Sequence, residues 1–516
     1  MMAQLFTERR STGTGNRLAS AVVVCALGGL SGCMVGPDYV GPKMEVSDAW
    51  HQEAVEGLAA GDAVLQNWWT LFDDPALTSL IERAEDGNRG LEVALHRVRE
   101  ARAILGVSTG ELVPDLNPIG SYERSRISPN GLLAPLYQGA DPDQTNLHRI
   151  GFDSSWEIDI FGRIRRSVES SEANLEATVE DYRDSLVSLY AEVALNYVEV
   201  RTLQARLEYA QNNVEAQRAT LRLTRDRRKA GIAPDLDVSQ AESNLARSES
   251  LIPALQIALT QTVNRLCVLI GEPPTALHEE LSRPAPIPVP PESVSVGLPA
   301  ELLRQRPDVR RAERQVAAAS AQIGVATADL YPQFSLSGTF ALEGTAVRDL
   351  GNMSSRAWSF GPAFRWNIFD GLRNIYRIRA AEAVTDQALA RYEQTVLRAL
   401  EDVENAMVAY KLEQTRRDAL EQAVRATERS VELVKKLYET GLTDFQNVLD
   451  SERSLLNAQD ELADSEGRVT KDLIALYKAL GGGWSLEDQA SARAEESGLG
   501  RVRDDSSEDA PDVSEG

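Results

Sequence analysis

Few residues of this chain lie at the spacings that a catalytic or metal-binding site requires. The histidines, His51, His96, His148 and His278, are scattered, and none lies at metal-ligand spacing from cysteines or carboxylates. His278 is followed by two glutamates but not by the second histidine of a zinc-protease helix. The sequence also lacks a glycine-rich phosphate loop and a Gly-x-Ser-x-Gly elbow. We therefore predict no enzyme, no metal site and no cofactor.

One cysteine is placed for a covalent modification. Arginines precede the apolar run Leu18–Leu30, which is too short to cross a membrane as a helix and has the features of a signal peptide. The stretch Leu30-Ser31-Gly32-Cys33 resembles the lipobox of bacterial lipoproteins, in which the cysteine is acylated and becomes the first mature residue. We expect lipidation at Cys33; an ordinary secretory signal with a chance cysteine is the alternative. Cys267 would remain alone, so no intrachain disulfide is expected.

The elements that follow are written twice. The segment Trp156–Gly271 aligns without a gap on Trp366–Gly481, and the upstream pieces match at a slightly larger shift. Each copy contains an aromatic run, about seventy residues of helical pattern, one glycine and more helix. A long internal repeat is strong evidence of architecture. We predict two long helical hairpins of equal length.

The helices can be bounded from their periodicity. The expected long helices are Arg163–Arg228 and Leu372–Thr440, and the expected short helices are Pro75–Leu112, Asp235–Ile270, Pro299–Leu330 and Thr443–Leu480. Asp74 followed by Pro75 is a good helix start, because an aspartate can cap the helix and proline suits its first position. Apolar residues of the first long helix recur at steps of three and four, which predicts left-handed coiled-coil packing.

Four segments between the helices read as β-strands. In the first copy two segments flank the loop Pro129–Asp143, the second of them around Trp156, and in the second copy the segments lie around Phe334 and from Trp358 to Trp366. Apolar and polar residues alternate over about ten positions, the pattern of transmembrane strands. Soluble hairpins packed on a core are the alternative, but nothing else in the chain offers such a core. Four strands cannot close a barrel, and an open edge is not tolerated in lipid. Two chains would supply eight strands and three would supply twelve, and periodicity does not choose between them.

Composition agrees with long helices and argues against nucleic acid as a partner. The net charge is −24, whereas phosphate binding needs concentrated lysine and arginine. The proline-rich stretch between the copies predicts a stiff, extended connector.

The expected organisation is a signal peptide (1–32), a lipidated extended segment (33–74), a first repeat (75–271), the connector (272–298), a second repeat (299–481) and an acidic disordered tail (482–516).

Together these residues resemble the TolC-type outer-membrane efflux channels, in particular their lipoprotein (NodT/OprM-like) branch that works with resistance-nodulation-division pumps. The resemblance covers nearly everything from Leu30 to Gly483. It rests on the lipobox, on Gly36-Pro37-Asp38-Tyr39, on Asp74-Pro75-Ala76-Leu77, on Arg306-Pro307-Asp308-Val309 and on the runs that begin at Trp156, Tyr331 and Trp366.

The resemblance implies a mainly α fold with a β-barrel part, in which a homotrimer shares a twelve-stranded barrel and continues it as a periplasmic helical barrel. It implies a passive, gated duct in the outer membrane that works with a periplasmic adaptor protein and an inner-membrane transporter. It assigns barrel aromatic positions to Trp156, Trp358 and Trp366.

The hairpin tips are the functional sites that the resemblance favours. Gly231 and Gly441 fit turns that need a positive φ, and Asp235 and Asp237 lie beside the first turn. The resemblance places Asp450 in a ring of carboxylates that narrows the closed entrance, with Asn447 and Asp444 beside it. A solvated helix residue paired with Arg453 is the alternative for Asp450. Only the second copy carries this set, so we expect the second hairpin to lie nearer the pore axis when it is closed.

A periplasmic coiled-coil adaptor is the rival function. It would account for the helices and the lipobox, but not for amphipathic strands placed symmetrically in a repeat. The exported substrate cannot be read from these residues, since the pump and the adaptor do the choosing.

Overall fold

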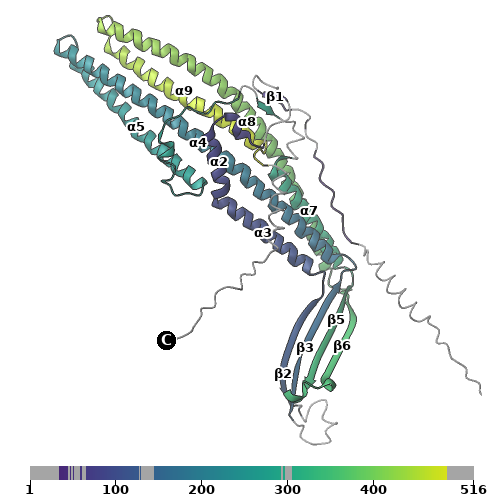
Figure 1. Cartoon of the computed structure of the whole chain (residues 1–516). Coiled ribbons are helices and arrows are strands. Elements are labelled where there is room, and N and C mark those ends of the chain that lie inside the picture. Colours follow the sequence, from purple (N-terminus) through teal and green to yellow (C-terminus); the bar gives the residue numbers. More distant parts are fainter. Residues whose placement is uncertain are drawn as a thin grey trace, which may run out of the picture. The chain divides into compact units, whose positions relative to one another are not determined.

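The computed structural model describes residues 34–44, 47, 50–51, 58–60, 66–126, 128, 144–291, 294–296 and 305–484 (Figure 1). The chain divides into two compact units. The first, here called the sheet unit, takes the described residues of Met1–Lys43 with Val98–Thr178 and Ala312–Tyr392. The second, the hairpin unit, takes those of Met44–Arg97, Val179–Arg311 and Glu393–Gly516. Each unit draws on both sequence repeats, so neither repeat folds as a unit of its own.

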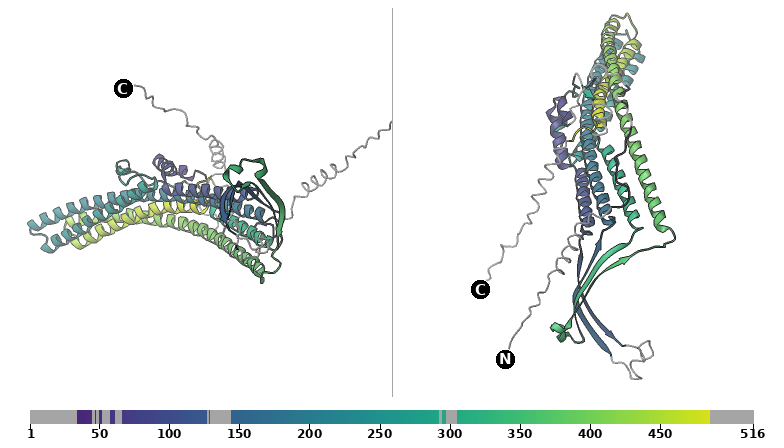
Figure 2. Two further views of the ribbon diagram at one scale, coloured as in Figure 1. Left: turned by 90° about the horizontal axis from the view of Figure 1, so that it is seen from below. Right: turned by 90° about the vertical axis from the view of Figure 1, so that its right-hand side faces the viewer.

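The sheet unit is built on four antiparallel strands that lie side by side in both views (Figures 1 and 2). They are β2 (Asp115–Ser125), β3 (Thr145–Ile158), β5 (Gln333–Gly344) and β6 (Arg356–Arg365), in the order β2-β3-β5-β6. The central pair, β3 with β5, joins the two sequence repeats. The predicted strands are therefore confirmed, except that Trp366 lies one residue beyond the end of β6.

The long helices agree with the sequence patterns. α4 (Arg163–Lys229) and α8 (Arg373–Glu439) each have 67 residues, which corresponds to roughly 100 Å of helix. α5 (Asp235–Leu269) and α9 (Phe445–Ala479) each have 35 residues. α7 (Pro307–Ala328) begins later than the predicted Pro299, and residues 299–304 lie outside the described part of the chain.

The predicted helix Pro75–Leu112 is wrong as a single element. It is divided into α2 (Pro75–Gly87) and α3 (Arg89–Gly110) at Asn88. The Asn88 side chain accepts a hydrogen bond from the Leu91 amide and donates one to the Leu269 carbonyl at the end of α5. Gly87 lies so close to Ile270 that an added Cβ would approach its carbonyl oxygen to 2.2 Å. The helix is interrupted because its backbone packs directly against another helix end.

The tryptophan-rich segment before α2 forms part of the core of the hairpin unit. It contains the 3-10 helix η1 (Trp68–Phe72), in which Trp68 is fully buried and stacks on Tyr477 of α9 with ring centroids 5.4 Å apart. Asp74 caps α2 as predicted by accepting the amides of Ala76 and Leu77. Its second oxygen accepts the Tyr197 hydroxyl of α4 at 2.7 Å, so one carboxylate joins two helices.

The segment Gly36-Pro37-Asp38-Tyr39 has a comparable structural role in the sheet unit. Arg166 of α4 is almost completely buried and donates to the carbonyls of Val35 and Gly36 and to the Asp38 carboxylate. Gly36 has a φ of +89° and packs against Gly324 of α7, where an added Cβ would clash at 2.5 Å. The Tyr39 hydroxyl donates to Glu313 of α7. This segment therefore anchors the extended amino-terminal stretch of the chain to α4 and α7.

The connector is less extended than predicted. It includes the 3-10 helix η3 (Glu280–Ser282), and its Leu277 and Leu281 are buried against the hairpin unit. Its strand β4 (Val294–Val296) pairs in parallel with β1 (Leu58–Ala60). The remaining short elements are η4 (Val347–Asp349) and η5 (Met353–Ser355), which lie between β5 and β6. Over the described residues, none of the helices has the length and apolar character needed to cross a membrane.

Candidate functional site

Both hairpin turns are closed by a glycine in the left-handed region. Gly231 has a φ of +77° and Gly441 a φ of +76°. The amides of Gly231 and Ile232 donate to Arg228 and Arg227, and the amides of Gly441 and Leu442 donate to Tyr438 and Leu437 in the same way. These paired bonds form the Schellman motif, which satisfies the last carbonyls of a helix and needs a residue without a Cβ penalty. The repeat therefore produces the same turn twice.

The two tips pack together within one chain. The two helical hairpins lie side by side (Figure 1). Their buried side chains form one apolar cluster, here called the tip cluster, which joins α4 and α5 to α8 and α9. Its members are Leu221, Val238, Ala241, Tyr438, Phe445, Val448 and Leu449. Non-directional apolar contacts of this kind hold the hairpins together without fixing a single register between them.

Arg227 covers the tip cluster. Its guanidinium carbon lies 4.5 Å from the centroid of the Tyr438 ring, and its Nη1 donates to the Glu439 carbonyl at 2.9 Å. The Tyr438 ring in turn packs against the Phe445 ring, with centroids 5.3 Å apart. A cation over an aromatic face and a bond to a helix-terminal carbonyl both favour this position. Arg227 thus ties the end of α4 to the end of α8.

The carboxylates of the first tip differ in their surroundings. Asp235 begins α5 and is exposed, and it forms an ion pair with Arg228 at 2.6 Å. Burial raises the pKa of the Asp237 carboxyl, and the negative charge of Asp444 adds to the rise. Asp237 therefore places one carboxylate of the first hairpin within electrostatic reach of the second hairpin.

The predicted gate residues lie along the first turns of α9. Asp444 occupies the position before α9, and its carbonyl accepts the Asn447 amide. The Asn447 side chain donates to the Thr443 hydroxyl at 2.8 Å. Asp450 is exposed, accepts a bond from Gln446 at 3.0 Å and lies 3.6 Å from Arg453. Within one chain Asp450 is thus a solvated carboxylate with a cation beside it.

The basic residues before the first tip have partners within the chain. Arg225 pairs with Glu242, Arg228 with Asp235 and Lys229 with Asp226, all at exposed positions. Exposed pairs of this kind are weak, so they leave the charges available to solvent and to an approaching surface.

A seam of polar side chains, here called the α4–α9 seam, joins the two hairpins behind the tip cluster. Its α4 members are spaced seven residues apart and bond to α9. The pairs are Glu199 with Lys471, Arg206 with Asp460, Asn213 with Gln459 and Thr220 with Glu452. A seven-residue spacing keeps one face of a helix against its neighbour. The contact between the hairpins is therefore partly polar along its length.

The two faces of the four-stranded sheet have opposite character. Phe152, Phe340 and Trp358 are neighbours across β3, β5 and β6, and Phe360 and Phe364 lie on the same face. These five aromatic side chains are between 49% and 74% exposed. Because side chains alternate along a strand, the intervening residues form the other face. An exposed aromatic face on an antiparallel sheet is typical of strands that contact lipid.

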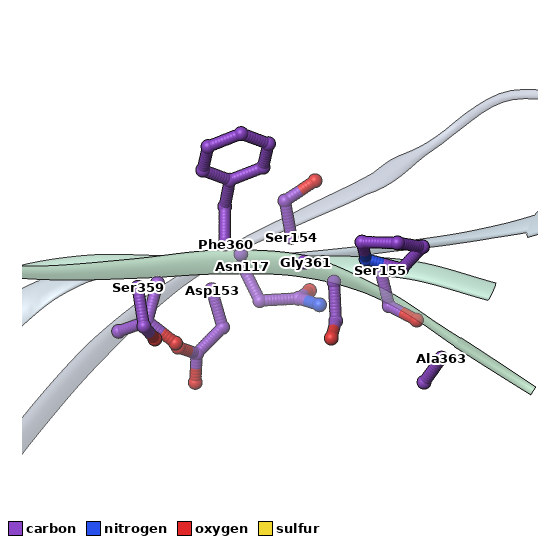
Figure 3. Close-up of a pocket in the computed structure, with 12 residues that line it drawn as sticks. Asn117, Asp153, Ser154, Ser155, Ser359, Phe360, Gly361 and Ala363 are labelled. Atoms are coloured by element: carbon purple, nitrogen blue, oxygen red, sulfur yellow. The ribbon is translucent and has the colours of Figure 1, made fainter.

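The opposite face is polar and hollowed, as Figure 3 shows. Phe360 and Ser154 point to one side of the sheet, whereas Asn117, Asp153 and Ser359 point to the other. The hollow has a volume of about 510 Å³ and lies over residues of β2, β3, β5 and β6. Polar residues on this face suit contact with water rather than with lipid.

The predicted aromatic positions are placed in two ways. The Trp156 indole, near the end of β3, donates to the Leu112 carbonyl at 3.0 Å, and the Trp366 indole donates to the Leu330 carbonyl at 3.0 Å. These equivalent bonds hold the end of the second strand of each β-hairpin against the residues that precede its first strand. Trp358 near the start of β6 is 71% exposed on the aromatic face. Because Tyr and Trp favour membrane interfaces, Trp358 suits an interfacial position.

Cys33 lies outside the described residues, and its acylation stays a prediction. Within the part of the chain that the structure describes, no group of three or more His, Cys, Asp or Glu side chains could hold a metal ion. Cys267 is a buried free cysteine, and such a residue packs like a small apolar side chain.

Sequence reasoning missed Tyr438 and Phe445 at the tips and the buried Glu452 in the seam. The aromatic pair carried a signal, because an aromatic residue on either side of Gly441 has no equivalent around Gly231. Glu452 carried none, since a glutamate in a charged helix reads as a solvated residue.

Comparisons with known proteins agree with this geometry. The profile of a family described as "Outer membrane efflux protein" matches residues 80–272 and 298–482. The chain is 31% identical over 457 residues to nodulation protein T of Rhizobium leguminosarum bv. trifolii, which covers 88% of this chain and 96% of that protein. It is 30% identical to outer membrane protein OprJ of Pseudomonas aeruginosa, over 88% of this chain and 94% of that protein.

A solved structure shares the fold. The outer-membrane channel OprN superposes with a TM-score of 0.81 at 38% sequence identity, covering 88% of this chain and all of that chain.

Proposed function

The chain belongs to the outer membrane efflux protein family, and from this premise we propose that three copies form a passive, gated channel of a tripartite pump. The family match decides between the two functions that the sequence left open: the chain is an outer-membrane efflux channel and not a periplasmic adaptor. The remaining questions are how the chains assemble into a ring and which partner proteins the channel works with.

The open edges of the sheet are the observation that carries the proposal. In the described sheet, β2 and β6 each have one neighbour. Backbone groups at an edge must be paired in lipid, so β2 of one chain pairs with β6 of the next. The strand directions alternate across the sheet, which makes this new pair antiparallel like the others. Such a head-to-tail interface generates a closed ring, and three chains give twelve strands.

The orientation of the ring follows from its two faces. The aromatic face meets lipid and the hollowed polar face lines a water-filled passage, because the reverse would bury carboxylates in hydrocarbon. The family likeness to channels of efflux pumps supports a periplasmic adaptor and an inner-membrane resistance-nodulation-division transporter as partners. The hairpin tips, with Gly231, Asp235, Asp237 and Gly441, are the surface that we assign to the adaptor. Acylation at Cys33 adds a lipid anchor, which mass spectrometry of the mature amino terminus would detect.

The second hairpin provides the gate. Asp450 is exposed one turn into α9, with Asp444 and Asn447 on the preceding turn. Three like charges held around a narrow axis repel one another unless cations or hydrogen bonds offset them. Arg453 and Gln446 supply part of that offset within each chain. We assign the closed entrance to this ring of residues.

The test is conductance of the purified full-length protein in planar bilayers. We expect discrete single-channel steps from a heat-modifiable trimer, and a larger conductance when Asp450, Asn447 and Asp444 are replaced by serine. The matched control is Asp226→Ser, which removes an exposed tip carboxylate from the first hairpin. A folded trimer without conductance would refute the channel, whereas an unchanged conductance in the triple variant would refute the gate alone.

A further inference from the structure

One row of the polar sheet face crosses all four strands. Asn117 of β2 is in register with Asp153 of β3, Asp153 with Thr339 of β5, and Thr339 with Ser359 of β6. The row lies within the hollow of the sheet (Figure 3). Its members are polar, and Asp153 is the one that carries a charge.

Among the described residues, a hydroxyl group and not a cation holds Asp153 in place. Its Oδ1 accepts the Thr339 hydroxyl at 2.6 Å, a short bond that fixes the carboxylate over the centre of the row. Ion pairs on this face join Arg149 to Glu343 and Arg163 to Glu157, and Asp153 takes part in neither. Its negative charge therefore acts on the adjacent solvent.

The neighbouring charges on the same face strengthen the negative potential around Asp153 more than they weaken it. Asp115 lies in the next row, in register with Ser155, and is exposed. Arg149 and Arg365 are opposing charges, but Arg149 is paired with Glu343, and Arg365 donates to Gln333 and lies three rows from Ser359. A passage lined by one sign of charge with low-dielectric walls concentrates solutes of the opposite sign.

Resting on the proposed function, in which this face lines the passage, we propose that Asp153 makes the sheet-lined part of the channel favour cationic over anionic solutes. A ring of chains presents one such carboxylate per chain at one level. The substrate class that this ring favours comprises small cations and protonated amines. Its effect is distinct from that of the hairpin tips, because it acts on solutes within the sheet-lined part of the passage.

The experiment measures the local potential at the row directly. Ser359→Cys places a thiol in the row, and whole cells carrying the full chain are treated from outside with a cationic or an anionic methanethiosulfonate reagent. We expect the cationic reagent to react roughly threefold to tenfold faster at low salt, and the preference to shrink as salt rises. Asp153→Asn, which can still accept the Thr339 hydrogen bond, should bring the two rates close together.

Matched variants separate the charge from the structure around it. Thr339→Val removes the hydroxyl but keeps the carboxylate, so the preference should persist. Ser154→Cys lies on the aromatic face and should react with neither reagent, and the parent chain reports the background from buried Cys267. Equal rates with Asp153 intact would overturn the inference, as would a Ser359→Cys thiol that neither reagent reaches in a folded trimer.

A second measurement distinguishes failure of the inference from failure of the proposed function. In planar bilayers under a KCl gradient, Asp153→Asn should move the reversal potential toward zero while the channel still conducts. Conductance with an unchanged reversal potential and unchanged reagent rates refutes the role of Asp153 and leaves the channel standing. No conductance from the parent trimer refutes the channel itself.

Discussion

At the scale of single residues, Asp472 of α9 is the carboxyl whose surroundings most alter its chemistry. Burial raises its pKa from 3.8 to about 6, and the negative charge of Glu413 contributes, against smaller opposing effects of Arg468 and Lys471. The folded state therefore binds this proton more tightly than the unfolded chain does.

The sign of the pH effect follows. A carboxyl with a raised pKa stabilises the fold once it is protonated, so this contribution grows as pH falls through about 6 toward 3.8 and is lost as pH rises. We expect Asp472→Asn to raise the melting temperature of the detergent-solubilised protein at pH 7.5. The advantage of the variant over the parent should be roughly halved near pH 5 and should disappear as the pH approaches 3.8. A constant difference across that range would show that Asp472 is not the responsible group.

At the scale of elements, Glu452 is the point where three helices meet. It belongs to α9 and is 3% exposed, and it accepts the Thr220 hydroxyl of α4 at 2.6 Å and pairs with Lys435 of α8 at 2.9 Å. Breaking a buried ion pair costs roughly 3–5 kcal/mol because one charge is left without compensation. Lys435 is partly exposed, which reduces that cost.

We expect Lys435→Met to destabilise the protein by roughly 2–3 kcal/mol, measured by denaturant unfolding in detergent. Adding Glu452→Gln should recover most of the loss, because the amide keeps the Thr220 bond without a buried charge. Lys436→Met is the control: its partner Glu432 is exposed, so the change should be below about 1 kcal/mol. Equal effects of the two lysine variants would contradict a special role of the buried Glu452 ion pair.

At the scale of the whole molecule, the two free sheet edges make assembly a condition of folding in lipid. A closed ring and an open-ended row of protomers pair through the same β2 and β6 edges. Cross-linking between protomers distinguishes them, because the number of linked protomers has a fixed limit only in a closed ring.

Pairs of cysteines report on closure. Ser121→Cys in β2, combined in turn with Ala357→Cys, Ser359→Cys and Gly361→Cys in β6, samples the registers of the new strand pair in a Cys267→Ser background. At the correct register we expect oxidation to give a ladder on non-reducing gels that ends at three chains. Bands that continue beyond three would contradict the closed trimer, and Ser337→Cys in central β5 should give no link with Ser121→Cys.

Much of the architecture was predictable because its determinants are local. The long helices follow from apolar spacing, the turns at Gly231 and Gly441 from the need for a positive φ, and the strands from alternation with a period of two. The family resemblance added the expectation that three chains assemble. The interruption at Asn88 was missed although Gly87, Asn88 and Gly90 are poor helix formers, because the apolar spacing continues across them. The hydrogen bond from Asn88 to Leu269 and the close approach of Ile270 to Gly87 fix the break at this position.

The sequence by itself determined the doubled pattern, the lengths of the two long helices and the two faces of each strand, since each depends on residues a few positions apart. Only the tertiary structure decided which residues meet. It placed Asp153 beside Thr339 across 186 residues of chain and Thr220 beside Glu452 across 232. Those contacts depend on strand register and on how helices rotate against each other, and the same one-dimensional period is compatible with several registers. The charge in the sheet hollow and the polar seam between the hairpins are properties of that packing.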